Sequence, residues 1–271
     1  MTADEIVGRM DLVERLLDTL ELRSVVLTGE RRLGKTTLTT LLEEVAPARG
    51  WSLVKVSVEG LKASDELYAV LIREIDRVGR SGIGKSARAA KDAVEGVKVA
   101  GVQLAPSSPV LDAVIRAAVQ RLEGRLLLVL DELPIFVRTA DARSSGAGTD
   151  VLHALRRIRQ DCGLRMLMLG SIGFHHATKD ATGVLNDVDR ERLTALDRDD
   201  AIELALRLLN GEGLCGDDAL AVAVEIARQA DCVPYYVHSI VEAAKRRPGR
   251  PPLQVGEVDG LVEAQLIAGD A

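Results

Sequence analysis

The sequence of 271 residues predicts an α/β fold, a five-stranded parallel sheet covered by helices, followed by a small all-helical domain. Short apolar runs rich in β-branched residues alternate with amphipathic segments up to residue 196, and such alternation favours a parallel sheet. Beyond residue 196 only helical periodicity remains. We therefore expect a first domain over residues 1–196 and a helical second domain over residues 197–271.

The individual elements follow from the spacing of apolar residues. The expected strands are SVVLT (24–28), SLVKVSV (52–58), LLLVL (126–130), RMLMLGS (165–171) and ERLTAL (191–196). Helical spacing predicts helices at 11–22, 36–46, 65–78, 110–122 and about 149–160, then at 197–210, 217–230 and 233–247. Residues 79–109 are rich in Gly, Ala, Lys and Ser, which indicates a flexible insertion.

Composition narrows the function classes. The net charge is −6 and aromatic residues make up 2% of the chain, which disfavours diffuse binding to nucleic-acid backbones and stacking on bases. The three cysteines are scattered, which fits a reducing compartment better than a disulfide framework. The sequence begins without a signal-peptide pattern and has no apolar run that could span a bilayer, so a cytoplasmic location without membrane contact is expected.

Two segments match the phosphate-loop pattern G-x-x-x-x-G-K-[ST], namely GERRLGKT (29–36) and GRSGIGKS (79–86). The pattern binds phosphate where a strand precedes the loop and a helix follows it, because loop N–H groups and the helix N-terminus then face the anion. The first segment has this context. The second follows an amphipathic helix, so we interpret Gly79 as a helix C-cap that leads into a basic connector. The expected nucleotide contacts are Gly29, Glu30, Arg31, Arg32, Leu33, Gly34, Lys35, Thr36 and Thr37.

An acidic pair follows a buried strand in LLLVLDE (126–132). Thr36 and Asp131 are the expected magnesium ligands, and Glu132 is the candidate base for the attacking water, whereas Lys35 would bind the phosphates. The alternative for the acidic pair is a solvated loop or a helix N-cap. The strand at 52–58 lies in sequence between the loop and this pair, which suits the P-loop NTPase branch with an intervening strand and a catalytic glutamate (the ASCE type). No N-K-x-D motif is present, which favours ATP over GTP.

Further candidates lie near the ends of the last two strands. Ser171 follows the strand at 165–171, where its hydroxyl could touch the γ-phosphate or the attacking water, although Gly-Ser is also common in turns. Arg190 and Arg192 precede or begin the last strand. Either of them could stabilise transition-state charge in a neighbouring subunit, and either could be a solvated surface arginine.

Taken in order, the segments VGR (7–9), GERRLGKTTL, LLLVLDEL, MLGSI, DRERLTALDRDDAIEL and VPYYVHSIVEAA resemble the AAA+/STAND P-loop ATPases, and within them the archaeal-type ATPase group related to origin-recognition and signal-transduction ATPases. The resemblance implies that Val7, Gly8 and Arg9 lie near the adenine, that Ser171 occupies the sensor-1 position and that residues 197–271 form a lid. It also implies that Pro234 approaches the nucleotide, although Cys232 stands where such lids usually have glycine, and no lid arginine of the sensor-2 kind is evident.

The sequence therefore predicts an ATPase that binds ATP and Mg²⁺ and hydrolyses ATP slowly as a conformational or assembly switch, with a protein partner or a homo-oligomer. One alternative is an ATP-binding signalling or interaction module with negligible turnover. The other is a DNA-associated ATPase of the loading or transposition type. The segment KRRPGRPP (245–252) is compatible with a minor-groove-binding arm, but we interpret it as a basic helix end that Pro248 terminates.

Overall fold

The computed structural model describes residues 6–81, 108–121, 125–177 and 181–269. Contacts divide the chain into two units. The sheet unit comprises residues 14–29 and 42–192, and the helical unit comprises residues 1–13, 30–41 and 193–271. Each unit is built from segments that are not consecutive in the sequence. The predicted domain boundary between residues 196 and 197 stays a prediction.

Five parallel strands form the sheet of the sheet unit, which confirms the predicted α/β fold. They are β1 (Val25–Thr28), β2 (Trp51–Ser57), β3 (Arg125–Asp131), β4 (Arg165–Gly170) and β5 (Asp189–Arg192). Their order is β2-β3-β4-β1-β5. A strand does separate β1 from β3, but it is β4 and not the strand at 51–57, which lies at the edge beside β3.

The last strand lies earlier than the sequence pattern predicts. We expected it at 191–196, whereas β5 covers Asp189–Arg192. It pairs with β1 alone, so it is an edge strand, and its side chains alternate between half-buried and exposed. Charged residues are tolerated on such an edge, and they conceal the strand from a search for apolar runs. Leu193 and Leu196 are buried, but they follow the strand and belong to the helical unit.

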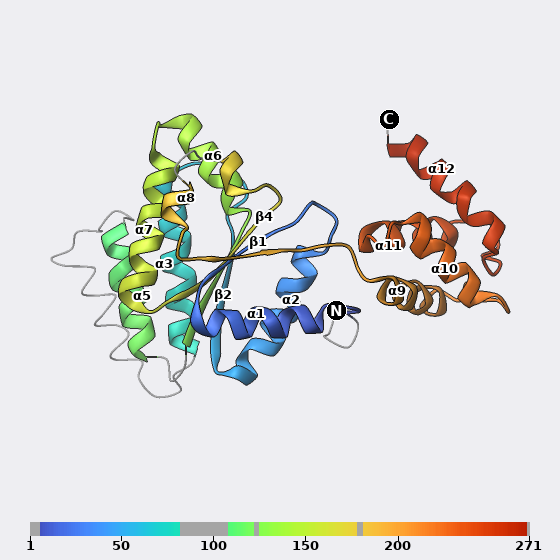
Figure 1. Cartoon of the computed structure of the whole chain (residues 1–271), viewed down its shortest axis with the longest axis horizontal. Helices are drawn as coiled ribbons and strands as arrows, with labels where there is room; N and C mark the ends of the chain where they lie inside the picture. Colours follow the sequence, from blue (N-terminus) through green and yellow to red (C-terminus); the bar gives the residue numbers. More distant parts are fainter. Residues whose placement is uncertain (1–5, 82–107, 122–124, 178–180, 270–271) are drawn as a thin grey trace. The chain divides into compact units, whose positions relative to one another are not determined.

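Helices precede and connect the strands along the chain. They are α1 (Met10–Leu22), α2 (Lys35–Val45), α3 (Ser64–Ser81), α5 (Ser108–Arg121), α6 (Leu133–Arg143), α7 (Ala147–Cys162) and the short α8 (Ala181–Val184). Figure 1 shows α3, α5 and α7 side by side, and contacts join these three helices to one another. Their apolar stripes bury residues such as Leu71, Ile115 and Leu155 in one core with the β3 residues Leu128 and Leu130. Burial of these aliphatic side chains holds the sheet and its helical layer together.

Two helix predictions need correction. The pattern of apolar residues does not predict α6, which begins directly after the acidic pair with Pro134 in its first turn, a position where proline is well tolerated. Gly79 is not a C-cap, because α3 continues through it to Ser81. Glycine in a helix costs about 1 kcal/mol relative to alanine, which the last turn of a long packed helix can absorb.

The four C-terminal helices form the core of the helical unit, drawn in orange to red in Figure 1. They are α9 (Arg198–Gly211), α10 (Ala219–Gln229), α11 (Pro234–Lys245) and α12 (Val258–Gly269). The first three match predicted helices. The fourth was not expected, since its sequence, VDGLVEAQLIAG, is apolar on most sides and shows no clear stripe. Val7, far away in sequence, is buried in the same core as Leu209, Ile226 and Val237.

Within the described ranges, no helix has the length and apolar character needed to cross a membrane.

Candidate functional site

The first phosphate-loop segment lies between a strand and a helix. β1 ends at Thr28, residues 29–34 form the loop, and α2 begins at Lys35. The second segment has no such context, because Gly79–Ser81 are the end of α3. Its remaining residues, 82–86, and the rest of the predicted insertion up to residue 107 lie outside the described residues. Of the two segments, the first is the one with a strand before it and a helix after it, and its binding of phosphate stays a prediction.

Two residues of the loop have left-handed backbone conformations, Arg32 with φ 75° and Gly34 with φ 88°. The curled loop brings the amino group of Lys35 back onto its own backbone, where Nζ donates a hydrogen bond to the carbonyl oxygen of Glu30 at 3.1 Å. The lysine side chain is buried, whereas Thr36 at the next position is exposed. The first turn of a helix is a common setting for an anion site, because its N–H groups lack the regular intrahelical acceptors.

The segment Val7–Arg9 contacts the loop within the helical unit. Arg9 is 6% exposed, and its Nη2 donates hydrogen bonds to the carbonyl oxygens of Leu33 at 3.1 Å and Thr194 at 2.9 Å. Burial lowers the pKa of Arg9, although the nearby carboxylates of Asp200 and Asp197 act to raise it. Gly8 has φ 69°, and a methyl group there would lie 2.4 Å from an oxygen of Asp200. This predicted adenine-side segment is thus anchored to the phosphate loop through Arg9.

The chain just before α11 also adopts a left-handed backbone. Cys232 has φ 56°, its N–H donates to Ala227, and its carbonyl oxygen accepts the N–H of Leu196 at 3.0 Å. This conformation explains why glycine would suit the position, since a Cβ is unfavourable there. α11 then begins at Pro234, and its first turn carries Tyr235 and Tyr236.

The two tyrosines bind the phosphate loop. The Nη1 of Arg32 donates a hydrogen bond to the hydroxyl oxygen of Tyr236 at 2.7 Å. The guanidinium carbon lies 4.8 Å from the centre of the Tyr235 ring and 5.4 Å from that of Tyr236. The sequence patterns did not identify this contact. A signal was available in the form of adjacent tyrosines in a chain with few aromatic residues.

The acidic pair lies at the carboxyl edge of the sheet. Asp131 is the last residue of β3, and Glu132 follows with a left-handed backbone, φ 62° and ψ 31°. The Oε2 of Glu132 accepts two hydrogen bonds from Ser171, one from its N–H at 3.0 Å and one from its hydroxyl at 2.9 Å. The structure therefore brings together Glu132 and Ser171, the predicted base and the predicted sensor. Both bonds use the same carboxylate oxygen of Glu132, Oε2.

β4 connects this edge to the start of the phosphate loop. The N–H of Gly29 donates to the carbonyl oxygen of Gly170 at 3.2 Å, and Gly170 immediately precedes Ser171. A methyl group on Gly170 would lie 2.5 Å from Cγ of Pro134, so the close packing of β4 against the start of α6 requires glycine. The carboxyl ends of β1, β3 and β4 are thus tied together within the sheet unit.

The two candidate arginines lie on the outer strand. Arg190 and Arg192 are both exposed, and because they are two residues apart in β5 they lie on the same face of the strand. Neither guanidinium forms an ion pair within the described part of the chain. An arginine-finger role for either of them stays a prediction.

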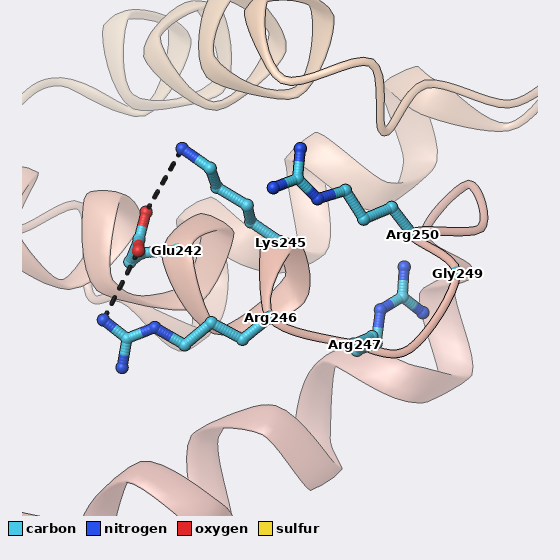
Figure 2. A pocket seen from close by; sticks show the side chains of 6 residues that line it. All are labelled: Glu242, Lys245, Arg246, Arg247, Gly249 and Arg250. Carbon is cyan, nitrogen blue, oxygen red and sulfur yellow. Dashed lines mark hydrogen bonds and ion pairs between the residues drawn. The ribbon is translucent and has the colours of Figure 1, made fainter.

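A separate basic hollow lies at the C-terminal end of α11 and is lined by Glu242, Lys245, Arg246, Arg247, Gly249 and Arg250 (Figure 2). Its volume is about 680 Å³. KRRPGRPP does contain a helix end, but α11 ends at Lys245 with Arg246 as its C-cap, two residues before the predicted end at residue 247. Figure 2 shows Glu242 between Lys245 and Arg246, and it pairs with them at 3.9 and 3.3 Å. Arg247 pairs with Glu257 at 2.6 Å. In the described chain Arg250 has no ion-pair partner.

The sequence profile of the AAA domain family matches residues 21–177. That stretch contains the phosphate loop, the acidic pair and Ser171. Among curated proteins, no sequence match to the chain is found.

Several solved structures have the same fold. A Walker-type ATPase of Pyrococcus abyssi is 17% identical, with a TM-score of 0.68 over 98% of this chain and 75% of that chain. The ORC2 protein of Aeropyrum pernix, in complexes with ADPNP and ADP, is 16% identical, with a TM-score of 0.58 over 95% and 69% of the two chains. The ORC1 protein of Aeropyrum pernix, in complex with DNA, is 18% identical, with a TM-score of 0.56 over 97% and 67%. At these identities the similarity concerns the fold.

Proposed function

This chain belongs to the AAA domain family, and from that premise we propose that it binds ATP with Mg²⁺ and hydrolyses it to ADP and phosphate as a conformational or assembly switch. The observation that carries the proposal is the loop between β1 and α2. Its left-handed Gly34, its buried Lys35 and the helix start behind it supply the cation, the backbone curl and the N–H groups that a polyphosphate requires.

The residues present also fit a magnesium ion. The hydroxyl of Thr36 and the carboxylate of Asp131 are hard oxygen donors, which Mg²⁺ prefers, and two protein ligands leave coordination positions for phosphate oxygens and water. When bound, Mg-ATP supplies an electrophilic γ-phosphoryl group whose developing charge the metal stabilises. We assign Val7, Gly8 and Arg9 to the adenine side of the nucleotide. Residues 197–271, which include Pro234, are assigned to a lid.

Within this scheme each side chain has one task. Lys35 binds phosphate oxygens, and Glu132 accepts the proton of the attacking water. Ser171 is a positioning residue, because its two hydrogen bonds to Oε2 fix the orientation of the Glu132 carboxylate. A base held in one orientation loses less entropy on reaching the transition state than a freely rotating one.

Two substitutions test the proposal. Lys35→Ala should abolish ATP binding in equilibrium dialysis. Glu132→Gln should bind ATP as the parent does and lose turnover by at least about 100-fold, because a neutral amide cannot accept the proton. Lys85→Ala, in the second phosphate-loop pattern, is the matched control and should leave binding intact. Normal ATP binding by Lys35→Ala would show that the assignment is wrong.

Turnover should also be measured over a wide range of protein concentration. Arg190 and Arg192 are exposed on an edge strand, so a role in hydrolysis would be exerted on another subunit. Specific activity that rises with protein concentration supports an assembling ATPase. Tight ATP binding with negligible turnover at every concentration identifies the alternative, a signalling or interaction module.

The basic hollow supports a second candidate function, an ATPase associated with DNA. Arg250 and Arg246 are exposed there in a chain whose net charge is −6, and a protein of similar fold was solved with DNA. Three carboxylates already pair with Lys245, Arg246 and Arg247, which weakens the case. Titration of duplex DNA at low salt tests it. Binding that weakens with salt and is reduced by Arg250→Ala supports the function, and no binding at low salt excludes it.

A further inference from the structure

Arg32 occupies an unfavourable backbone conformation in the middle of the phosphate loop. Its φ of 75° lies in the left-handed region, which an arginine adopts at a cost and which glycine adopts freely. Such conformations persist where surrounding contacts hold them, and they concentrate at ligand sites and switch regions. The contacts that hold Arg32 therefore bear on how the loop works.

Those contacts come from the first turn of α11. Tyr236 accepts the hydrogen bond from Nη1 at 2.7 Å, and the rings of Tyr235 and Tyr236 lie within 4.8 and 5.4 Å of the guanidinium carbon. The two rings meet edge to face, with centroids 5.6 Å apart and planes at 77°. Three side chains thus form one cluster, and all of them belong to the helical unit.

The cluster is exposed to solvent, since Tyr235 is 49% and Tyr236 40% exposed. Exposed cation–π contacts and hydrogen bonds to a neutral hydroxyl are weak, so they can be exchanged for stronger ones. A phosphate group offers the guanidinium charged oxygens in a geometry that matches its paired N–H donors. A polyphosphate bound in the loop would therefore compete with the tyrosines for Arg32.

We propose that Arg32, Tyr235 and Tyr236 form a nucleotide-responsive latch between the phosphate loop and α11. The contacts in the structure are those of the closed latch, and a nucleoside polyphosphate opens it by drawing the guanidinium from the tyrosines to its phosphates. This inference rests on the proposed function, and it assigns that function a regulatory output, the release of α11.

The first test uses the full chain without nucleotide. Hydrogen–deuterium exchange of the amides in residues 234–245 should rise about threefold in Tyr236→Phe, which loses the hydrogen bond and keeps the ring. Tyr235→Phe keeps its ring over the guanidinium and should change exchange less. Arg125→Ala is the matched control, since it removes an arginine from the ring of Trp51, 4.3 Å away, in the sheet unit. Equal exchange in Tyr236→Phe and the parent would overturn the closed latch.

The second test adds Mg²⁺ and ADPNP, with binding measured separately by equilibrium dialysis. In the parent, exchange in residues 234–245 should rise to the level of Tyr236→Phe, whereas in that variant the analogue should add little. Binding without a change in exchange, or with slower exchange, overturns the latch and leaves the proposed function standing. Absence of binding overturns both, so the two failures are distinguishable.

Discussion

Gly170 offers a sharp test of how the sheet edge is built. It ends β4, and its carbonyl oxygen accepts the N–H of Gly29, the first residue of the phosphate loop. A methyl group at this position would lie 2.5 Å from Cγ and 2.8 Å from Cδ of Pro134, and 2.9 Å from the carbonyl oxygen of Ile172. Gly170→Ala therefore places one carbon against three atoms that belong to a rigid ring and to the backbone.

The size of the effect follows from these distances. Carbon atoms pack best at about 3.5–4.0 Å, so the proline ring must retreat by about 1 Å or the strand must shift. Overpacking of this kind costs about 1–3 kcal/mol, and we expect the upper part of that range because no flexible side chain can yield. Pro134 lies two residues after Glu132, so the displacement should also disturb the carboxylate that Ser171 holds, with a loss of turnover.

Urea denaturation followed by the fluorescence of Trp51 measures the cost. This residue is the single tryptophan of the sequence, and it is buried in β2 of the sheet unit, so its signal reports that unit. Gly260→Ala is the control, because a methyl group there meets nothing within 4 Å and alanine favours a helix interior. If Gly170→Ala unfolds within about 0.5 kcal/mol of the parent and keeps its turnover, the packing argument is wrong.

Three further outcomes are expected. Ser171→Ala should lower turnover about tenfold at unchanged ATP affinity, because Glu132 loses one of its two orienting hydrogen bonds. Steady-state kinetics measure the turnover and equilibrium dialysis measures the affinity, and a changed affinity would contradict the positioning role. Burial, followed by the hydrogen bond to Asp112, raises the pKa of Cys162 to about 11. About a thousandth of this thiol is therefore ionised at pH 8, and the rate of its alkylation by iodoacetamide should rise tenfold for each pH unit. An alkylation rate that levels off near pH 9 would contradict the raised pKa. Cys232→Gly should stabilise the helical unit by about 0.5–1 kcal/mol, measured by thermal unfolding, since the left-handed backbone no longer carries a Cβ.

The parts of the fold that sequence patterns predict are those with a local signal. β3 reads RLLLVLD and is buried along almost its whole length, so an apolar run suffices to find it. β5 reads DRER, and its pairing with β1 is a property of the assembled edge that no local pattern contains. Sequence patterns also fail to predict the helix α6. Its first turn follows the acidic pair directly and contains a proline, and its apolar residues are irregularly spaced.

The candidate site divides in the same way. The phosphate loop is recognisable because its chemistry lies in eight consecutive residues between a strand and a helix. The contact between Glu132 and Ser171 joins residues that are 39 positions apart. It arises because β3 and β4 are neighbours with Leu130 opposite Met168, and only knowledge of the strand order would have revealed it.

Several residues of the sites described above share a left-handed backbone conformation. Among the described residues, the non-glycine positions with positive φ are Arg32, Glu132, Asp231, Cys232 and Arg250. They lie in the phosphate loop, directly after β3, directly before α11 and in the basic hollow. Glycine would adopt each conformation at lower cost, so the retained side chains imply either a contact that compensates or a function that needs them. For Arg32 the contact is the tyrosine pair, and for Glu132 it is Ser171. Arg32 in the helical unit and Glu132 in the sheet unit are thus each held by a hydrogen-bonded partner, and both are residues that the proposed function assigns to the nucleotide or to its hydrolysis.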